Sequence, residues 1–117
     1  MEKTLTISGR DVKFRATAAV PRLYRIKFGR DIMQDMKEIQ EAVNKSKAGE
    51  EGIPPRMLET FENVAYIMAR HADPDMPERS VEDWLDGFET FSIYEVFPEL
   101  VGLWKLNTLS IAKSKKK

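Results

Sequence analysis

The sequence predicts a small α+β domain, mostly helical, in which an N-terminal β-hairpin packs on four or five helices. Apolar and polar residues alternate near the N-terminus, whereas apolar residues recur every three or four positions over most of the remaining chain. Clusters of Gly and Pro separate these periodic stretches. A chain of 117 residues suits one domain, which we place at residues 1–112, ahead of a flexible basic tail at 113–117.

The hairpin is expected over residues 3–16. Four apolar residues alternate with polar ones on either side of a turn sequence: Leu5, Ile7, Val12 and Phe14. The loop is either Ser8-Gly9 or Gly9-Arg10, and both registers keep the four apolar side chains on one face. That face must lie on helices, because an isolated hairpin is marginal in water. Three basic residues look like protection of the open strand edges against unwanted pairing: Arg10, Lys13 and Arg15.

Helices are predicted at about residues 18–45, 56–71, 81–88 and 92–112. The first follows Thr17, a suitable N-cap, and the pair Gly29 and Asp31 makes it either one kinked helix or two short ones. A loop at 46–55 precedes the second helix. This second helix has so little polar surface that we expect it to be the buried centre of the fold.

The C-terminal third holds both tryptophans and a dense set of apolar residues. Two Ser-x-x-acid sequences have the spacing of helix N-caps: Ser80 with Asp83, and Ser92 with Glu95. Pro98 predicts a bend or a fresh helix start. Beyond it the apolar residues do not keep to one stripe, so the helix is either enclosed by its own fold or exposed for another protein. Our candidates for partner binding lie there: Leu100, Leu103, Trp104 and Leu106.

Basic and acidic residues balance at 19 each, but they are unevenly spread. Residues 1–30 carry eight basic and two acidic residues, whereas residues 73–99 carry nine acidic residues and one basic residue. The two regions either neutralise each other inside the fold or meet between copies in head-to-tail self-association. The basic region also leaves open a nucleic-acid-binding regulator, with arginines beside Tyr24 and Phe28, although both aromatic residues fall on an apolar helical stripe.

Little in the sequence could support catalysis, so we expect no enzyme activity and no cofactor. Cysteine is absent, and so is a Gly-rich phosphate loop. We expect His71, the only imidazole, to lie partly protonated at a helix end rather than to bind a metal. Asp73, Asp75 and Glu78 lack the spacing of a calcium loop. No apolar run approaches the roughly 20 residues that span a bilayer, so no membrane contact is expected.

Five segments follow one another in a suggestive order: ISGRDVKFRATAA, PRLYRIKFGRDIMQDM, FENVAYIMARHADPDMP, EDWLDGF and IYEVFPELVGLW. Their most telling parts are Arg25–Asp31, Ala72–Pro74 and Glu82–Asp86. In these segments and their order, over nearly its whole length, the chain resembles the tail assembly chaperones of tailed phages and prophages with long non-contractile tails. None of the segments is a catalytic motif.

The resemblance implies a non-enzymatic role in virion assembly. Members of that family bind the long, helical tape-measure protein and keep it soluble while tail-tube subunits polymerise around it. They are absent from the mature virion. For this chain the resemblance implies the tape-measure protein as partner and the tail-tube protein as a further candidate, in the cytoplasm of an infected or lysogenic bacterial host. A structural virion protein is the remaining alternative.

Overall fold

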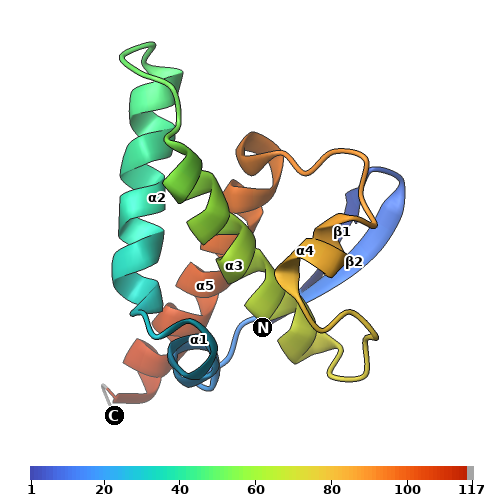
Figure 1. Ribbon diagram of the computed structural model, residues 1–117. Coiled ribbons are helices and arrows are strands. Elements are labelled where there is room, and N and C mark those ends of the chain that lie inside the picture. Colours follow the sequence, from blue (N-terminus) through green and yellow to red (C-terminus); the bar gives the residue numbers. More distant parts are fainter. Residues whose placement is uncertain (116–117) are drawn as a thin grey trace.

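The computed structural model describes the backbone of residues 1–115 and the side chains of residues 1–105 (Figure 1). In this part of the chain a two-stranded hairpin is followed by five helices, which confirms the predicted α+β, mostly helical fold. The elements are β1 (Glu2–Ile7), β2 (Arg10–Arg15), α1 (Val20–Phe28), α2 (Ile32–Lys47), α3 (Pro55–Ala72), α4 (Val81–Leu85) and α5 (Ile93–Lys115). The last helix continues three residues past its predicted end at 112.

The hairpin closes through a two-residue loop, Ser8-Gly9. The register pairs Leu5 with Val12, which decides between the two alternatives that the sequence left open. Both loop residues have positive φ, 52° at Ser8 and 76° at Gly9, as a type I′ turn requires. Ile7, Val12 and Phe14 of the apolar face are buried against the helices, and Leu5 packs partly buried beside them.

The first predicted helix is two helices. Gly29 ends α1 with a left-handed φ of 68°, and its N–H donates to the Arg25 carbonyl at 2.8 Å. Asp31 begins α2 by accepting a hydrogen bond from the Met33 N–H at 2.9 Å. The hydroxyl of Thr17 accepts from the Ala19 N–H, so it orders the turn just before α1 rather than the first helical turn.

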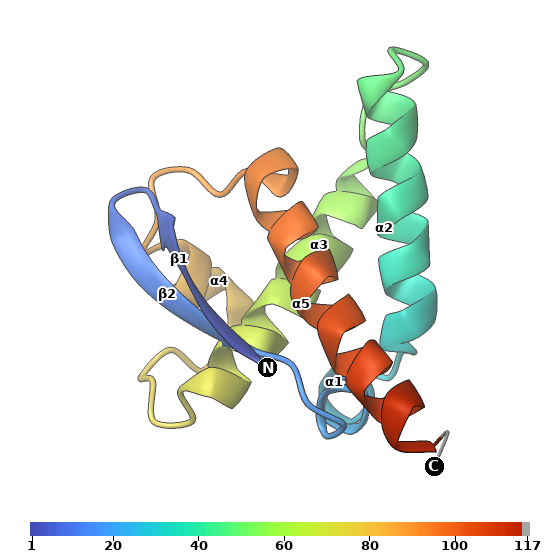
Figure 2. The same ribbon diagram turned by 180° about the vertical axis from the view of Figure 1, so that it is seen from behind.

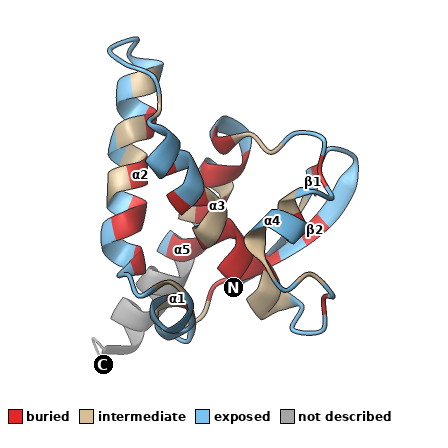
Figure 3. Cartoon of the chain, in the orientation of Figure 1, coloured by how far each residue is buried: buried red, intermediate tan, exposed pale blue. Residues whose placement is uncertain are grey.

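Helix α3 is the buried centre that the sequence predicts. It packs against β2, α1, α2, α4 and α5, and both views show these elements arranged around it (Figures 1 and 2). Nine of its 18 residues are buried. Figure 3 shows the other buried residues on the sides of the neighbouring elements that face α3. Because nearly every element uses α3 as its support, the positions of α2 and α5 relative to each other are set through it.

An aromatic cluster around Trp84 joins the hairpin, α3 and the segment before α5. The indole is buried, and its ring centroid lies 5.2 Å from Phe88, 5.3 Å from Phe91 and 5.7 Å from Tyr66. Ser80 caps α4 as predicted, accepting from the Asp83 N–H at 3.1 Å. The helix ends at Leu85, three residues before its predicted end, because the chain turns there to bring Phe88 and Phe91 back onto Trp84.

Helix α5 runs through Pro98 without a break. It starts at Ile93, and the Ser92 carbonyl accepts from the Glu95 and Val96 N–H groups at 3.2 and 3.0 Å. A fresh start at Pro98 is therefore wrong. Pro98 supplies no N–H for the carbonyl one turn earlier, a loss of roughly 3 kcal/mol or more in a helix interior. Burial of Val96, Phe97 and Leu100 around it offsets that loss.

Candidate partner-binding groove

The predicted binding residues on α5 are covered by the chain itself. Leu100 is 1% exposed, Leu103 5% and Trp104 9%. The side chain of Leu106, the fourth candidate, lies outside the described residues. Of the two alternatives for this helix, enclosure by its own fold therefore holds for these three side chains. They do not form an open apolar surface by themselves, so an accessible site has to include other residues.

Such a site lies between α2 and α5, where the two helices form the walls of an open groove of about 570 Å³. We call it the α2–α5 groove and define it by its lining residues: Met33, Met36, Lys37, Gln40, Val101, Trp104 and Lys105. The α2 residues share one helical face, since they follow the i, i+3, i+4, i+7 spacing. Most of the lining is apolar, and Met33 is 51% exposed. The groove thus combines an apolar floor with access from solvent.

Two contacts join α2 to α5, one within the groove and one beyond it. At one end the Trp104 Nε1–H donates to the Met33 Sδ at 3.0 Å. Towards the other end of α2, Ser46 and Tyr94 share a hydrogen bond between their hydroxyls. These pairs show that α2 and α5 run antiparallel, as Figure 2 also shows. From Met33 to Gln40 the α2 wall of the groove is about 10 Å long at 1.5 Å per residue.

The groove carries positive charge. Lys37 and Lys105 line it from opposite walls, and among its lining residues none is acidic. Glu38 and Glu41 of α2 line a separate hollow together with Arg56 and Met57. On α2, Glu38 and Glu41 therefore lie away from the groove, whereas Lys37 lines it.

A buried carboxylate fixes the start of α2 against α1. Asp35 is buried and accepts from Tyr24 Oη at 2.7 Å and from Arg30 Nε and Nη2 at 2.8 and 2.7 Å. Burial alone would raise the pKa of Asp35, but the hydrogen bonds from Arg30 and Tyr24 and the charges of Arg30 and Arg56 outweigh it, so this pKa is lowered. Burial and the bond to Asp35 raise the pKa of Tyr24. This network orients the turn of α2 that carries Met33 and Met36.

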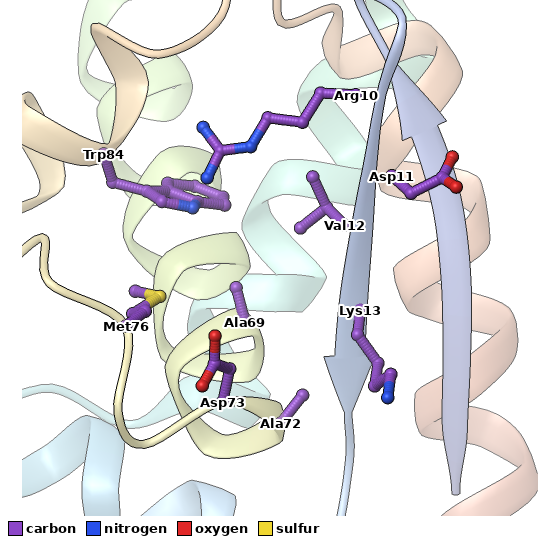
Figure 4. A pocket seen from close by; sticks show the side chains of 9 residues that line it. All are labelled: Arg10, Asp11, Val12, Lys13, Ala69, Ala72, Asp73, Met76 and Trp84. Atoms are coloured by element: carbon purple, nitrogen blue, oxygen red, sulfur yellow. The ribbon is translucent and has the colours of Figure 1, made fainter.

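Arg10 belongs to the inner face of the hairpin. The register pairs it with Ile7, so its side chain points toward the helices, as Figure 4 shows. Its guanidinium lies 5.1 Å from the Phe88 ring centroid and 3.7 Å from Glu78 Oε1. Edge protection by Arg10, Lys13 and Arg15 stays a prediction, and the period of the strand places Lys13 and Arg15 on the outer face. The hollow beside Arg10 mixes both charge signs, with Asp11, Lys13 and Asp73 in its lining.

His71 connects two parts of the chain. Its Nε2 lies 2.7 Å from the Thr17 hydroxyl, which ties the end of α3 to the segment before α1. Burial, the charge of Arg15 and the N-terminal ammonium lower the pKa of His71. This shift works against the expected partial protonation of the ring. Within the described part of the chain, no group of three or more His, Asp or Glu residues could hold a metal ion.

The basic and acidic regions do meet inside the fold. Lys3 pairs with Glu99, and Arg10 pairs with Glu78. These two pairs fit the internal-neutralisation alternative. Tyr24, one of the two aromatic residues beside the arginines, is fully buried and is not accessible for stacking on a base.

A second exposed apolar surface was missed by sequence reasoning. Ile26 is 72% exposed on α1, and together with Leu23 it borders a hollow whose lining also includes Lys27 and Arg70. The sequence did indicate that Ile26 is exposed, because Ile26 lies outside the apolar helical stripe formed by Val20 and Tyr24. Among the methionines, Met57 and Met76 are buried, and Met33 is exposed.

Comparisons with protein-family models, with curated proteins and with solved structures found no match to this chain. In the part that the structure describes, no helix has both the length and the apolar character needed to cross a membrane.

Proposed function

We propose that this protein is a non-enzymatic tail assembly chaperone of a long-tailed phage or prophage, and that it binds the tape-measure protein. The main observation in support of the proposal is the open, apolar α2–α5 groove, one wall of which is the C-terminal helix. The resemblance of the sequence segments to the tail assembly chaperones supplies the partner. A temporary complex in the host cytoplasm and absence from the mature virion belong to the same proposal, with the tail-tube protein as a further partner.

The groove has the properties that a helix-binding chaperone needs. An isolated amphipathic helix exposes an apolar face that promotes aggregation, and a groove between two helices can cover that face. At about 10 Å the α2 wall matches about two helical turns of a partner. Met33 and Met36 supply a flexible, polarizable lining that adapts to different apolar side chains. Such a lining suits a long partner that offers many similar helical segments.

The test is co-expression of tape-measure segments with the wild-type chain and with Met33→Glu. Position 33 is half exposed and lies in the first turn of α2, where an acidic residue complements the helix dipole, so the variant should fold. The charge in the groove should lower the soluble fraction of the segment at least about fivefold. Ile26→Glu is the matched control, because Ile26 is exposed and apolar but lies outside the groove.

Circular dichroism should show equal helix content and equal melting temperatures for the wild type and both variants. If folded Met33→Glu keeps the segments soluble as well as the wild type does, the groove is not the binding site. If the wild type itself leaves the segments insoluble and captures none of them, the proposed function fails. Finding the protein in purified particles would favour the structural virion alternative.

A further inference from the structure

We infer that the α2–α5 groove selects a helix whose apolar face is flanked by acidic residues. This inference rests on the proposed function, which places a partner helix in the groove, and it adds the charge that this helix must carry. It follows from how the lysines of the groove are placed and paired.

The two lysines of the groove stand on opposite walls. Lys37 projects from α2 and Lys105 from α5, so a helix lying between the walls would have a cation along each of its long edges. Their aliphatic stems extend the apolar lining while the ammonium groups stay at the rim. A partner helix with an acidic residue on each side of its apolar stripe would place a carboxylate near each ammonium.

Neither lysine is neutralised within the described part of the chain. There, Lys37 and Lys105 make no ion pair, whereas Lys3 pairs with Glu99 and Lys45 with Glu51. The side chains of Lys37 and Lys105 are exposed. Their charges are therefore available to a partner.

The sequence around Lys105 is basic. Residues 100–117 contain five lysines and no acidic residue. On α2, Glu38 and Glu41 line the hollow on another side of the helix. Complementary charge of this kind contributes mainly to partner choice and association rate, while the apolar floor contributes most of the affinity.

The proposed experiment measures binding of fluorescein-labelled helical peptides by anisotropy. Three 18-residue peptides share one leucine stripe with i, i+3, i+4, i+7 spacing and differ only in their flanking residues, which are Glu, Gln or Lys. The protein is the full chain, either wild type or Lys37→Glu/Lys105→Glu. Lys13→Glu/Lys47→Glu is the control, because it makes the same change in net charge at residues outside the groove lining.

We expect the wild type to bind the Glu-flanked peptide about tenfold more tightly than the Lys-flanked one at low salt, with the Gln-flanked peptide between them. Lys37→Glu/Lys105→Glu should reverse this order, the control pair should keep it, and raising the salt concentration should reduce the difference. Equal binding of the three peptides, no binding of any, or an unchanged order in the groove variant would overturn the inference.

The outcomes separate this inference from the proposed function. If tape-measure segments are kept soluble in a Met33-dependent way but the peptide order does not reverse, the chaperone role stands and the charge preference fails. If the order reverses but tape-measure segments are not bound, the groove recognises an acidic helix of another protein. Sedimentation of the chain alone adds one test, since a dimer that excludes the peptides would assign the groove to a second copy and overturn the inference.

Discussion

Replacing Asp35 by Asn should destabilise the protein more than any other single change of one polar atom on α2. The carboxylate accepts three hydrogen bonds, one from Tyr24 and two from Arg30, and it is buried. In the variant, the carboxamide nitrogen would face donors instead of accepting from them. The Tyr24 hydroxyl is itself buried, so loss of its acceptor leaves an unsatisfied group away from water.

The magnitude follows from these contacts. A hydrogen bond to a charged group contributes about 1.5–3 kcal/mol, and an orphaned buried donor costs about 1–3 kcal/mol. Arg30 is half exposed and can regain water, which reduces its share of the loss. We therefore expect the free energy of unfolding to fall by about 2–4 kcal/mol, or the melting temperature by about 8–16 °C for a domain of this size.

Urea unfolding followed by circular dichroism would measure this change. Glu41→Gln, on the exposed side of the same helix, should shift the free energy of unfolding by less than about 0.5 kcal/mol. A double-mutant cycle of Asp35→Asn with Tyr24→Phe should give a coupling of at least about 1 kcal/mol. A loss below about 1 kcal/mol for Asp35→Asn, or additive effects in the cycle, would refute the network as the element that joins α1 to α2.

The pH dependence of the free energy of unfolding tests the same Asp35 network in a second way. Because the folded-state pKa of Asp35 lies below its ordinary value of 3.8, its stabilising contribution is complete above that value and is lost as the pH falls through the lowered pKa. Acid unfolding of the wild type should therefore include a stability loss below about pH 4 that is absent in Asp35→Asn. Equal acid profiles for the two proteins would contradict the lowered pKa.

Two further predictions concern the hairpin and His71. Gly9→Ala should lower the free energy of unfolding by about 1 kcal/mol, because φ is +76° at this position. Gly52→Ala, at a position without positive φ, should change the free energy of unfolding by less than half as much. Equal effects of the two substitutions in urea titrations would contradict the turn assignment. The lowered pKa of His71 means that the unfolded state binds its proton first, so stability should fall as the pH drops from about 6.5 toward the lowered value. Melting curves of wild type and His71→Gln should diverge in that window, and parallel curves would refute this contribution.

Local sequence patterns were enough to predict most of the fold. Strand alternation, the Ser8-Gly9-Arg10 turn sequence and the Ser80 cap depend on neighbouring residues, so the sequence could predict them. The break between α1 and α2 stayed open because Gly29 is compatible with a kink as well as an end. The inward position of Arg10 depends on which of two hairpin registers forms, and both satisfied the apolar pattern.

The site was harder to predict than the fold. An apolar excess on α5 was visible in the sequence, but what covers Trp104 depends on where α2, some 70 residues earlier, packs. Helical periodicity identifies apolar faces and does not say which face meets which. Met33 could be placed on the surface only by the structure, because its position on α2 is compatible with either environment.

The central position of α3 links partner binding to the cooperativity of unfolding. Both walls of the groove rest on one helix, which also supports β2, α1 and α4, so the groove cannot open widely unless the whole core loosens. A ligand that occupies it only in the native state should therefore protect amides throughout the molecule from hydrogen exchange, including those of the distant hairpin.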